Sequence, residues 1–158
     1  MKTLVVFYSR TGTTKKVAEA IAQKTGADLE EIKDTANRSG AMGYVRSGRD
    51  AMRKKLTKLE PLLKNPADYD LVVIGTPIWG WNVSAPVRTY LTEQKEKFLP
   101  EADKKVAFFC TMGGSGDKNA FSEMEKIIGK EPVATLALTT KEVVKNDYSQ
   151  AIEDLNFS

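Results

Sequence analysis

Near its N-terminus the chain reads Leu4-Val5-Val6-Phe7-Tyr8-Ser9-Arg10-Thr11-Gly12-Thr13-Thr14, an apolar run followed at once by a loop rich in hydroxyl groups. The apolar residues are consecutive, which is typical of a strand covered on both faces in a parallel sheet. Between Thr14 and Lys24 the apolar side chains recur every three or four residues, and this spacing predicts a helix. The first elements are therefore a strand, a loop and a helix.

The same alternation continues along the rest of the sequence. Further strands are predicted over residues 28–32, 71–74, 106–110 and 133–138. Further helices are predicted over 43–59 and after the candidate N-caps Ser84, Asp117 and Asp147, with 33–42 as a surface loop. Because strands and helices alternate, the fold class is α/β. We expect a single domain over residues 1–158, a doubly wound five-stranded parallel sheet with helices on both faces.

Composition excludes several classes of function. The 158 residues hold 24 Lys and Arg against 21 Asp and Glu, a net charge of +3, which is far from the basic bias of a dedicated nucleic-acid binder. Histidine is absent, which excludes imidazole triads and His-containing zinc sites, so we expect no metal. The single cysteine, Cys110, fits a cytoplasmic protein and is expected in the core, with a thiol beside the ligand as the alternative. No apolar run is long enough for a membrane span.

The loop before the first helix is a candidate phosphate site. Ligands of doubly wound sheets bind beyond the carboxyl ends of the strands, which is where this loop lies. Its hydroxyl groups and the free amides of a helix N-terminus suit an anion, and Gly12 allows close approach. An ordinary helix cap is the alternative. Arg10 either helps to neutralise the phosphate or points into water.

Two further loops follow predicted strands. The second contains two tryptophans, Trp79 and Trp81, separated by Gly80, and large flat side chains at this end of a sheet suit stacking on a planar ring. The third, Thr111-Met112-Gly113-Gly114-Ser115-Gly116-Asp117, has three glycines that permit close backbone approach. A phosphate at the first loop and a planar ring at the second and third loops predict a mononucleotide ligand, whose ring system is either adenine or flavin.

The three loops together resemble those of the flavodoxin family. The matching motifs are Ser9-x-Thr11-Gly12-x-Thr14, Thr76-Pro77-x-Trp79-Gly80 and Gly113-Gly114-x-Gly116-Asp117. The resemblance extends along the whole chain and implies the strand order 2-1-3-4-5, non-covalent FMN and a role as an electron carrier.

The resemblance also implies roles for individual residues. The first loop would hold the phosphate, Trp79 would stack on the flavin ring, and Gly80 would offer its carbonyl to the N5–H of the reduced flavin after its peptide flips. Thr76, Pro77 and Ser115 would lie near the ribityl chain or ring edge. The complete set expected to bind the cofactor is Ser9, Arg10, Thr11, Gly12, Thr13, Thr14, Thr76, Pro77, Ile78, Trp79, Gly80, Trp81, Asn82, Thr111, Met112, Gly113, Gly114, Ser115, Gly116 and Asp117.

Two departures from the family keep other functions open. The third loop lacks the usual aromatic residue, so either Trp81 covers the outer flavin face or that face is open to a substrate. The chain is also basic rather than acidic, and residues 33–64 hold nine Lys and Arg against three Asp and Glu. This segment is either a solvated helix face or a docking site for a redox partner protein or a small-molecule acceptor.

The functional alternatives follow from these departures. An NAD(P)H-dependent FMN reductase of quinones or similar acceptors is the main alternative to a carrier, and a flavin-free binding module is another. A phospho-receiver domain is excluded because Ser9-Arg10 and Thr76-Pro77 stand where it needs acidic residues. Nucleic acid and membrane are not expected partners.

Overall fold

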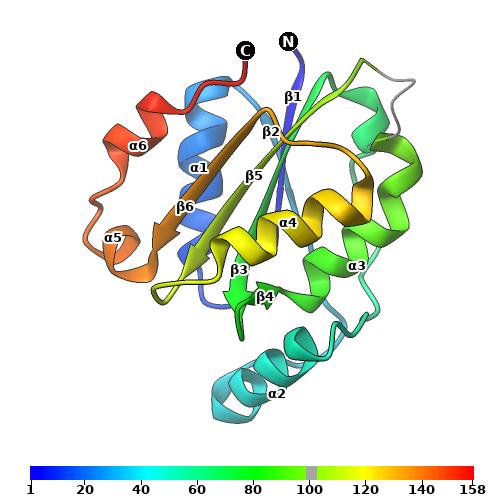
Figure 1. Cartoon of the computed structure of the whole chain (residues 1–158), viewed down its shortest axis with the longest axis vertical. Helices are drawn as coiled ribbons and strands as arrows, with labels where there is room; N and C mark the ends of the chain where they lie inside the picture. Colours follow the sequence, from blue (N-terminus) through cyan, green and yellow to red (C-terminus); the bar gives the residue numbers. More distant parts are fainter. Residues whose placement is uncertain (99–102) are drawn as a thin grey trace.

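A computed structural model describes residues 1–98 and 103–158. Its sheet contains five parallel strands in the spatial order β2-β1-β3-β5-β6, which confirms the predicted order of the five strands (Figure 1). The strands are β1 (Thr3–Phe7), β2 (Asp28–Glu31), β3 (Leu71–Trp79), β5 (Lys105–Met112) and β6 (Ala134–Thr139). A sixth, two-residue strand that the sequence did not predict, β4 (Asn82–Val83), pairs antiparallel with the end of β3.

Helices cover both faces of this sheet. The α-helices are α1 (Thr13–Thr25), α2 (Gly40–Met52), α3 (Ala85–Gln94), α4 (Asp117–Ile128), α5 (Thr140–Val144) and α6 (Ser149–Asp154), with short 3-10 turns at Pro66–Asp68 and Lys95–Phe98. One apolar core lies between the sheet and α3 and α4, and a second lies between the sheet and α1, α5 and α6. Within the described ranges, no helix is long and apolar enough to cross a membrane.

The two cores explain the unbroken apolar runs in the sequence. Leu4 and Val6 of β1 pack in the first core, whereas Val5 and Phe7 pack in the second. Alternate side chains of a strand point to opposite faces, so a strand buried on both sides must be apolar at every position.

Both ends of α2 differ from the prediction of a helix over 43–59: the helix begins at Gly40, inside the predicted surface loop 33–42. The helix stops at Met52, and Lys54 takes a left-handed backbone with φ 52°. The chain then runs on until Leu59 forms an isolated bridge with Asp34. Val45 and Met52, two apolar residues of the predicted helix, are exposed by 66% and 62%. In Figure 1, α2 stands beyond the carboxyl end of β3 rather than against a face of the sheet.

Other local predictions also need correction. Strand β3 continues through Trp79 and β5 continues through Met112, so the first parts of the predicted second and third loops are strand. Gly116, not Asp117, is the N-cap of α4. Tyr148, not Asp147, is the N-cap of α6, and a capping box occurs between Thr139 and Glu142 at α5.

Candidate functional site

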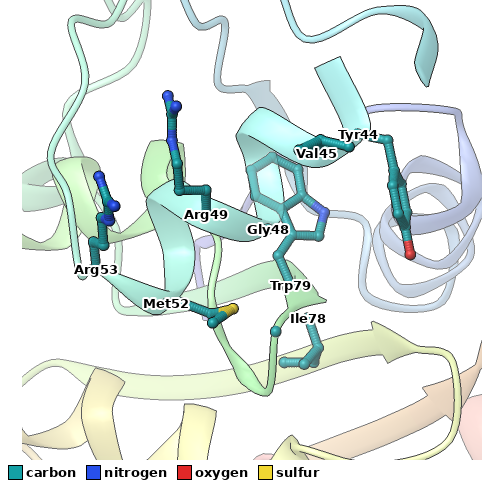
Figure 2. Close-up of a pocket in the computed structure, with 9 residues that line it drawn as sticks. Tyr44, Val45, Gly48, Arg49, Met52, Arg53, Ile78 and Trp79 are labelled. Atoms are coloured by element: carbon teal, nitrogen blue, oxygen red, sulfur yellow. The ribbon is translucent and has the colours of Figure 1, made fainter. Parts of the chain in front are cut away.

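Two neighbouring cavities open at the carboxyl end of the sheet. The first, called here the loop cavity, has a volume of about 300 Å³. The second, called the helix cavity, has a volume of about 510 Å³ and lies between α2 and the end of β3 (Figure 2). The loop cavity is lined by Ser9, Arg10, Thr11, Thr13, Thr14, Tyr44, Pro77, Ile78, Trp79, Thr111, Met112, Gly113 and Thr140. The helix cavity is lined by Tyr44, Val45, Gly48, Arg49, Met52, Arg53, Ile78, Trp79 and Gly80.

The first loop presents free backbone donors at the N-terminus of α1. The Ser9 hydroxyl oxygen accepts the amides of Gly12 at 3.0 Å and Lys15 at 3.2 Å. Within the part of the chain that the structure describes, the amides of Thr11, Thr13 and Thr14 have no partner. No acidic residue stands in the first turn of α1. Unpaired amides and the positive end of the helix dipole together favour an anion here.

Threonine hydroxyls join the first and third loops. The side-chain oxygens of Thr14 and Thr111 lie 2.8 Å apart, and both residues are buried. This bond holds the start of α1 against the end of β5. The Thr14 side chain therefore fixes the cavity wall, while its backbone amide stays available.

Arg10 lies against the start of α2 rather than pointing freely into water. Its guanidinium donates to the Arg38 carbonyl at 3.4 Å and stands 5.5 Å from the centre of the Tyr44 ring. Because Arg10 also lines the loop cavity, a positive charge is held at the edge of the group of free amides.

Trp79 forms part of the wall of both cavities, and its position is constrained from two sides. The Tyr8 ring packs edge-on at 5.5 Å and 88°, and the Arg38 guanidinium stands 5.4 Å from the ring centre. Arg38 is itself buried and pairs with Asp34 at 2.5 Å and Asp50 at 3.1 Å, so it does not belong to an exposed basic face. Burial raises the pKa of Tyr8, opposed only in part by Arg38, and Tyr8 is therefore a neutral phenol at physiological pH.

The turn after β3 is held by asparagine side chains. Gly80 and Trp81 both have positive φ, at 53° and 62°. The Gly80 carbonyl accepts from the Asn82 side-chain amide at 2.5 Å, and the Trp81 carbonyl accepts from Asn119 at 2.9 Å. Gly80 lines the helix cavity, not the loop cavity.

Trp81 packs over the third loop and lines neither cavity. It is 65% exposed, and its indole N–H donates to the Ser115 hydroxyl at 3.0 Å. Gly116, with φ 110°, is crowded, because a Cβ there would lie 2.8 Å from an Ile78 methyl and 2.9 Å from the Trp81 Cα. The glycine at 116 therefore serves the contact between the second and third loops.

Several predicted residues thus lie outside the loop cavity. The Thr76 hydroxyl bonds Ser84 at 3.0 Å and joins β3 to α3. Cys110 is buried, and burial raises the pKa of its thiol to about 12, in keeping with the core position that the sequence favoured. The predicted residues that do not line the loop cavity are Gly12, Thr76, Gly80, Trp81, Asn82, Gly114, Ser115, Gly116 and Asp117.

Two residues that line the loop cavity were not predicted. Thr140 follows β6 and donates its hydroxyl hydrogen to the Met112 carbonyl at 3.2 Å. The rule that sites lie beyond the ends of strands could have identified it. Tyr44 comes from α2, and its only sequence signal was an aromatic residue inside the basic segment.

Three solved structures resemble this chain over most of its length. A flavoprotein from Lactobacillus acidophilus NCFM in complex with FMN is 28% identical, with a TM-score of 0.68 over 91% of this chain and 97% of that chain. The apo-form of the flavoprotein from the same organism, solved by NMR, is 28% identical, with a TM-score of 0.63 over 91% and 95%. A candidate flavoprotein from Bacteroides uniformis ATCC 8492 is 26% identical, with a TM-score of 0.75 over 97% and 98%.

The sequence also matches a family as a whole. The pattern of the family described as flavodoxin matches residues 2–155. No curated protein has a significant match to the chain.

Proposed function

Because the chain belongs to the flavodoxin family, we propose that it binds FMN non-covalently at the loop cavity and transfers electrons through it. The observation that carries the proposal is the group of unpaired amides on Thr11, Thr13 and Thr14 beside a cavity rich in hydroxyl groups. A relative that is 28% identical was solved with FMN, which supports the choice of ligand.

The residues of the loop cavity suit each part of FMN. The phosphate would bind the free amides at the start of α1, next to the Arg10 guanidinium. The flavin ring would lie against Trp79, with Met112 and Gly113 on the third loop at its edge. FMN supplies the redox chemistry when bound, and these residues bind and orient it.

One observation favours a second candidate, an NAD(P)H-dependent reductase of quinones or similar acceptors. The helix cavity opens directly beside Trp79, and the third loop carries no aromatic side chain. A reductase needs such a space for a second ligand, whereas a carrier needs only a surface for its partner. The basic segment 33–64, without the buried Arg38, remains a proposed docking face for an acidic partner.

Titration of the apoprotein with FMN tests the main proposal. Because the phosphate is the recognised group, riboflavin should bind at least about tenfold more weakly than FMN. Thr13→Glu places a carboxylate among the free amides and should weaken the binding of FMN by a similar factor. Gln23→Glu makes the same charge change at an exposed site in α1 and should leave the affinity unchanged. Equal binding of FMN and riboflavin, or no binding of either, would contradict the proposal, and the latter would favour a flavin-free binding module.

Reduction of the FMN-loaded protein distinguishes the two candidates. Rapid, saturable bleaching of the flavin by NADH or NADPH supports a reductase. A flavin that is reduced by neither NADH nor NADPH, but is reduced stepwise by dithionite, supports a carrier.

A further inference from the structure

We propose that the helix cavity is a binding site for a planar aromatic organic anion, such as an aryl sulfonate or aryl carboxylate. The placement of this ligand beside the flavin rests on the proposed function. The site itself rests on the shape and chemistry of the cavity.

Apolar and aromatic side chains line the cavity. Val45 and Met52 are exposed by 66% and 62%, although both are large apolar residues. Figure 2 shows them along α2, with the Trp79 ring near the helix and Ile78 below it on β3. Exposed apolar side chains gathered around one hollow indicate a ligand site.

The lining of the cavity suits an aromatic ligand. The Gly48 position in α2 adds no side chain to the wall, and a Cβ built there meets nothing within 4 Å. Tyr44 and Trp79 also line the cavity. Aromatic side chains in the lining favour an aromatic ligand, which gains both buried area and ring contacts.

The charge around the cavity is positive and largely unneutralised. Arg49 and Arg53 stand four residues apart on the same side of α2, with their guanidinium ends pointing away from Met52 and Ile78 (Figure 2). Arg49 has only a loose ion pair, 3.7 Å from an Asp50 oxygen, and Arg53 has none in the described parts of the chain. Among the residues that the structure describes, none with an acidic side chain lines the cavity. Two guanidinium groups at the rim suit a sulfonate or carboxylate while the ring lies inside.

The two cavities share Tyr44, Ile78 and Trp79, so a ligand in one would lie close to a ligand in the other. If FMN occupies the loop cavity, an aromatic anion in the helix cavity stands where an organic electron acceptor or donor would have to stand.

Calorimetric titration of the FMN-loaded protein with naphthalene-2-sulfonate tests the proposal, with neutral 2-naphthol for comparison. The sulfonate should bind at least about tenfold more tightly than the naphthol. The double variant Arg49→Gln/Arg53→Gln should remove that preference. Arg46→Gln, an exposed arginine of α2 that lines neither cavity, is the matched control and should leave it intact.

A second pair of variants tests the apolar lining of the helix cavity. Met52→Glu should abolish binding, because it places a carboxylate in the cavity at a position that is 62% exposed. Met42→Glu, 84% exposed and outside both cavities, should have no effect.

The outcomes separate this inference from the proposed function. If FMN binds but the sulfonate does not, the inference is wrong and the proposed function stands. The same holds if Arg49→Gln/Arg53→Gln and Arg46→Gln change the preference for the sulfonate equally. If FMN fails to bind, the proposed function is wrong, and titration of the apoprotein still reports on the helix cavity. If FMN displaces the sulfonate, the two cavities form one flavin site and the inference is overturned.

Discussion

The guanidinium carbon of Arg38 lies 5.4 Å from the centre of the Trp79 ring, so a buried cation supports the aromatic side chain that the two cavities share. The same guanidinium pairs with Asp34, which precedes α2, and with Asp50, which lies near its end. These bonds place α2 over the carboxyl end of the sheet. The geometry of both cavities therefore depends on one buried ion cluster.

Arg38→Met should destabilise the protein by about 3 to 5 kcal/mol, because it leaves the buried Asp34 carboxylate without a cation and Asp50 with only its longer contacts to Arg46 and Arg49. Urea denaturation measures the loss, and a shift of tryptophan emission should accompany it as the environment of Trp79 changes. Arg46→Gln removes a longer, half-exposed contact to the same Asp50 at 3.9 Å and should cost less than about 1 kcal/mol. Similar losses in both variants would show that the buried cluster does not hold α2.

Two glycines of α2 should respond in opposite ways to alanine. A Cβ at Gly43 would lie 2.0 Å from the carbonyl carbon of Arg38, so Gly43→Ala must displace the helix and should cost about 2 kcal/mol or more. A Cβ at Gly48 meets nothing within 4 Å, and Gly48→Ala should stabilise the helix by about 0.5 to 1 kcal/mol. Thermal unfolding followed by circular dichroism compares them. A stable Gly43→Ala variant would mean that α2 does not pack on Arg38 as described.

The sheet and the phosphate loop could be predicted because their signals are local. Consecutive apolar residues from Leu4 to Phe7 report burial on both faces, and the motif Ser9-x-Thr11-Gly12-x-Thr14 lies within six residues. Each signal needs only its immediate neighbours in the chain.

The role of α2 could not be predicted because its determinants are tertiary. In the sequence, Arg38 is one of the nine basic residues of the segment 33–64. Only the folded chain brings Asp34, Asp50 and Trp79 around it. The sequence does not distinguish Met52 from a core residue, yet in the structure Met52 lines the helix cavity. Apolar spacing predicts that a residue contacts something apolar, but it does not distinguish a core from a ligand site.

A second ion cluster, formed by Glu123 with Lys54 and Arg88, should make the free energy of unfolding depend on pH. Burial alone would raise the pKa of Glu123, but hydrogen bonds from Lys54 at 2.6 Å and from Arg88 hold it below the usual value. A lowered folded-state pKa stabilises the protein above the unfolded pKa of about 4.3, and this stabilisation is lost as pH falls through the folded value.

Glu123→Gln should therefore cost about 3 kcal/mol at pH 7, because it leaves the Arg88 cation buried without a carboxylate. The difference from the wild type, measured by urea denaturation, should shrink as the pH is lowered toward 3. Glu125→Gln changes an exposed carboxylate on the same helix and should show neither effect. A difference that is constant between pH 7 and pH 3 would argue against the cluster.

Gly80 lines the helix cavity rather than the loop cavity, so its carbonyl would have to turn toward the loop cavity to reach a flavin bound there. The hydrogen bond from Asn82 opposes that turn and should therefore tune the redox potential under the proposed function. The Asn82 amide holds that carbonyl at 2.5 Å, and the peptide flip that would turn the carbonyl toward a flavin N5–H would break this bond. A hydrogen bond contributes about 1 kcal/mol, so breaking it opposes reduction by that amount. Asn82→Ala removes this opposition and should raise the midpoint potential for the first electron by about 40 mV.

Asn119→Ala is the matched control for this effect. Asn119 donates to the neighbouring Trp81 carbonyl at 2.9 Å and has a longer contact of 3.4 Å to the Asn82 side-chain oxygen, but it does not bond Gly80, so its loss should leave the bond from Asn82 to Gly80 in place. Both variants are compared by spectroelectrochemical titration of the FMN-loaded protein. A rise in potential for Asn82→Ala alone supports the Gly80 carbonyl as the acceptor for N5–H. Equal shifts in both variants would mean that general loosening of the turn is responsible, and an unchanged Asn82→Ala would mean that the Gly80 peptide does not exchange partners when the flavin is reduced.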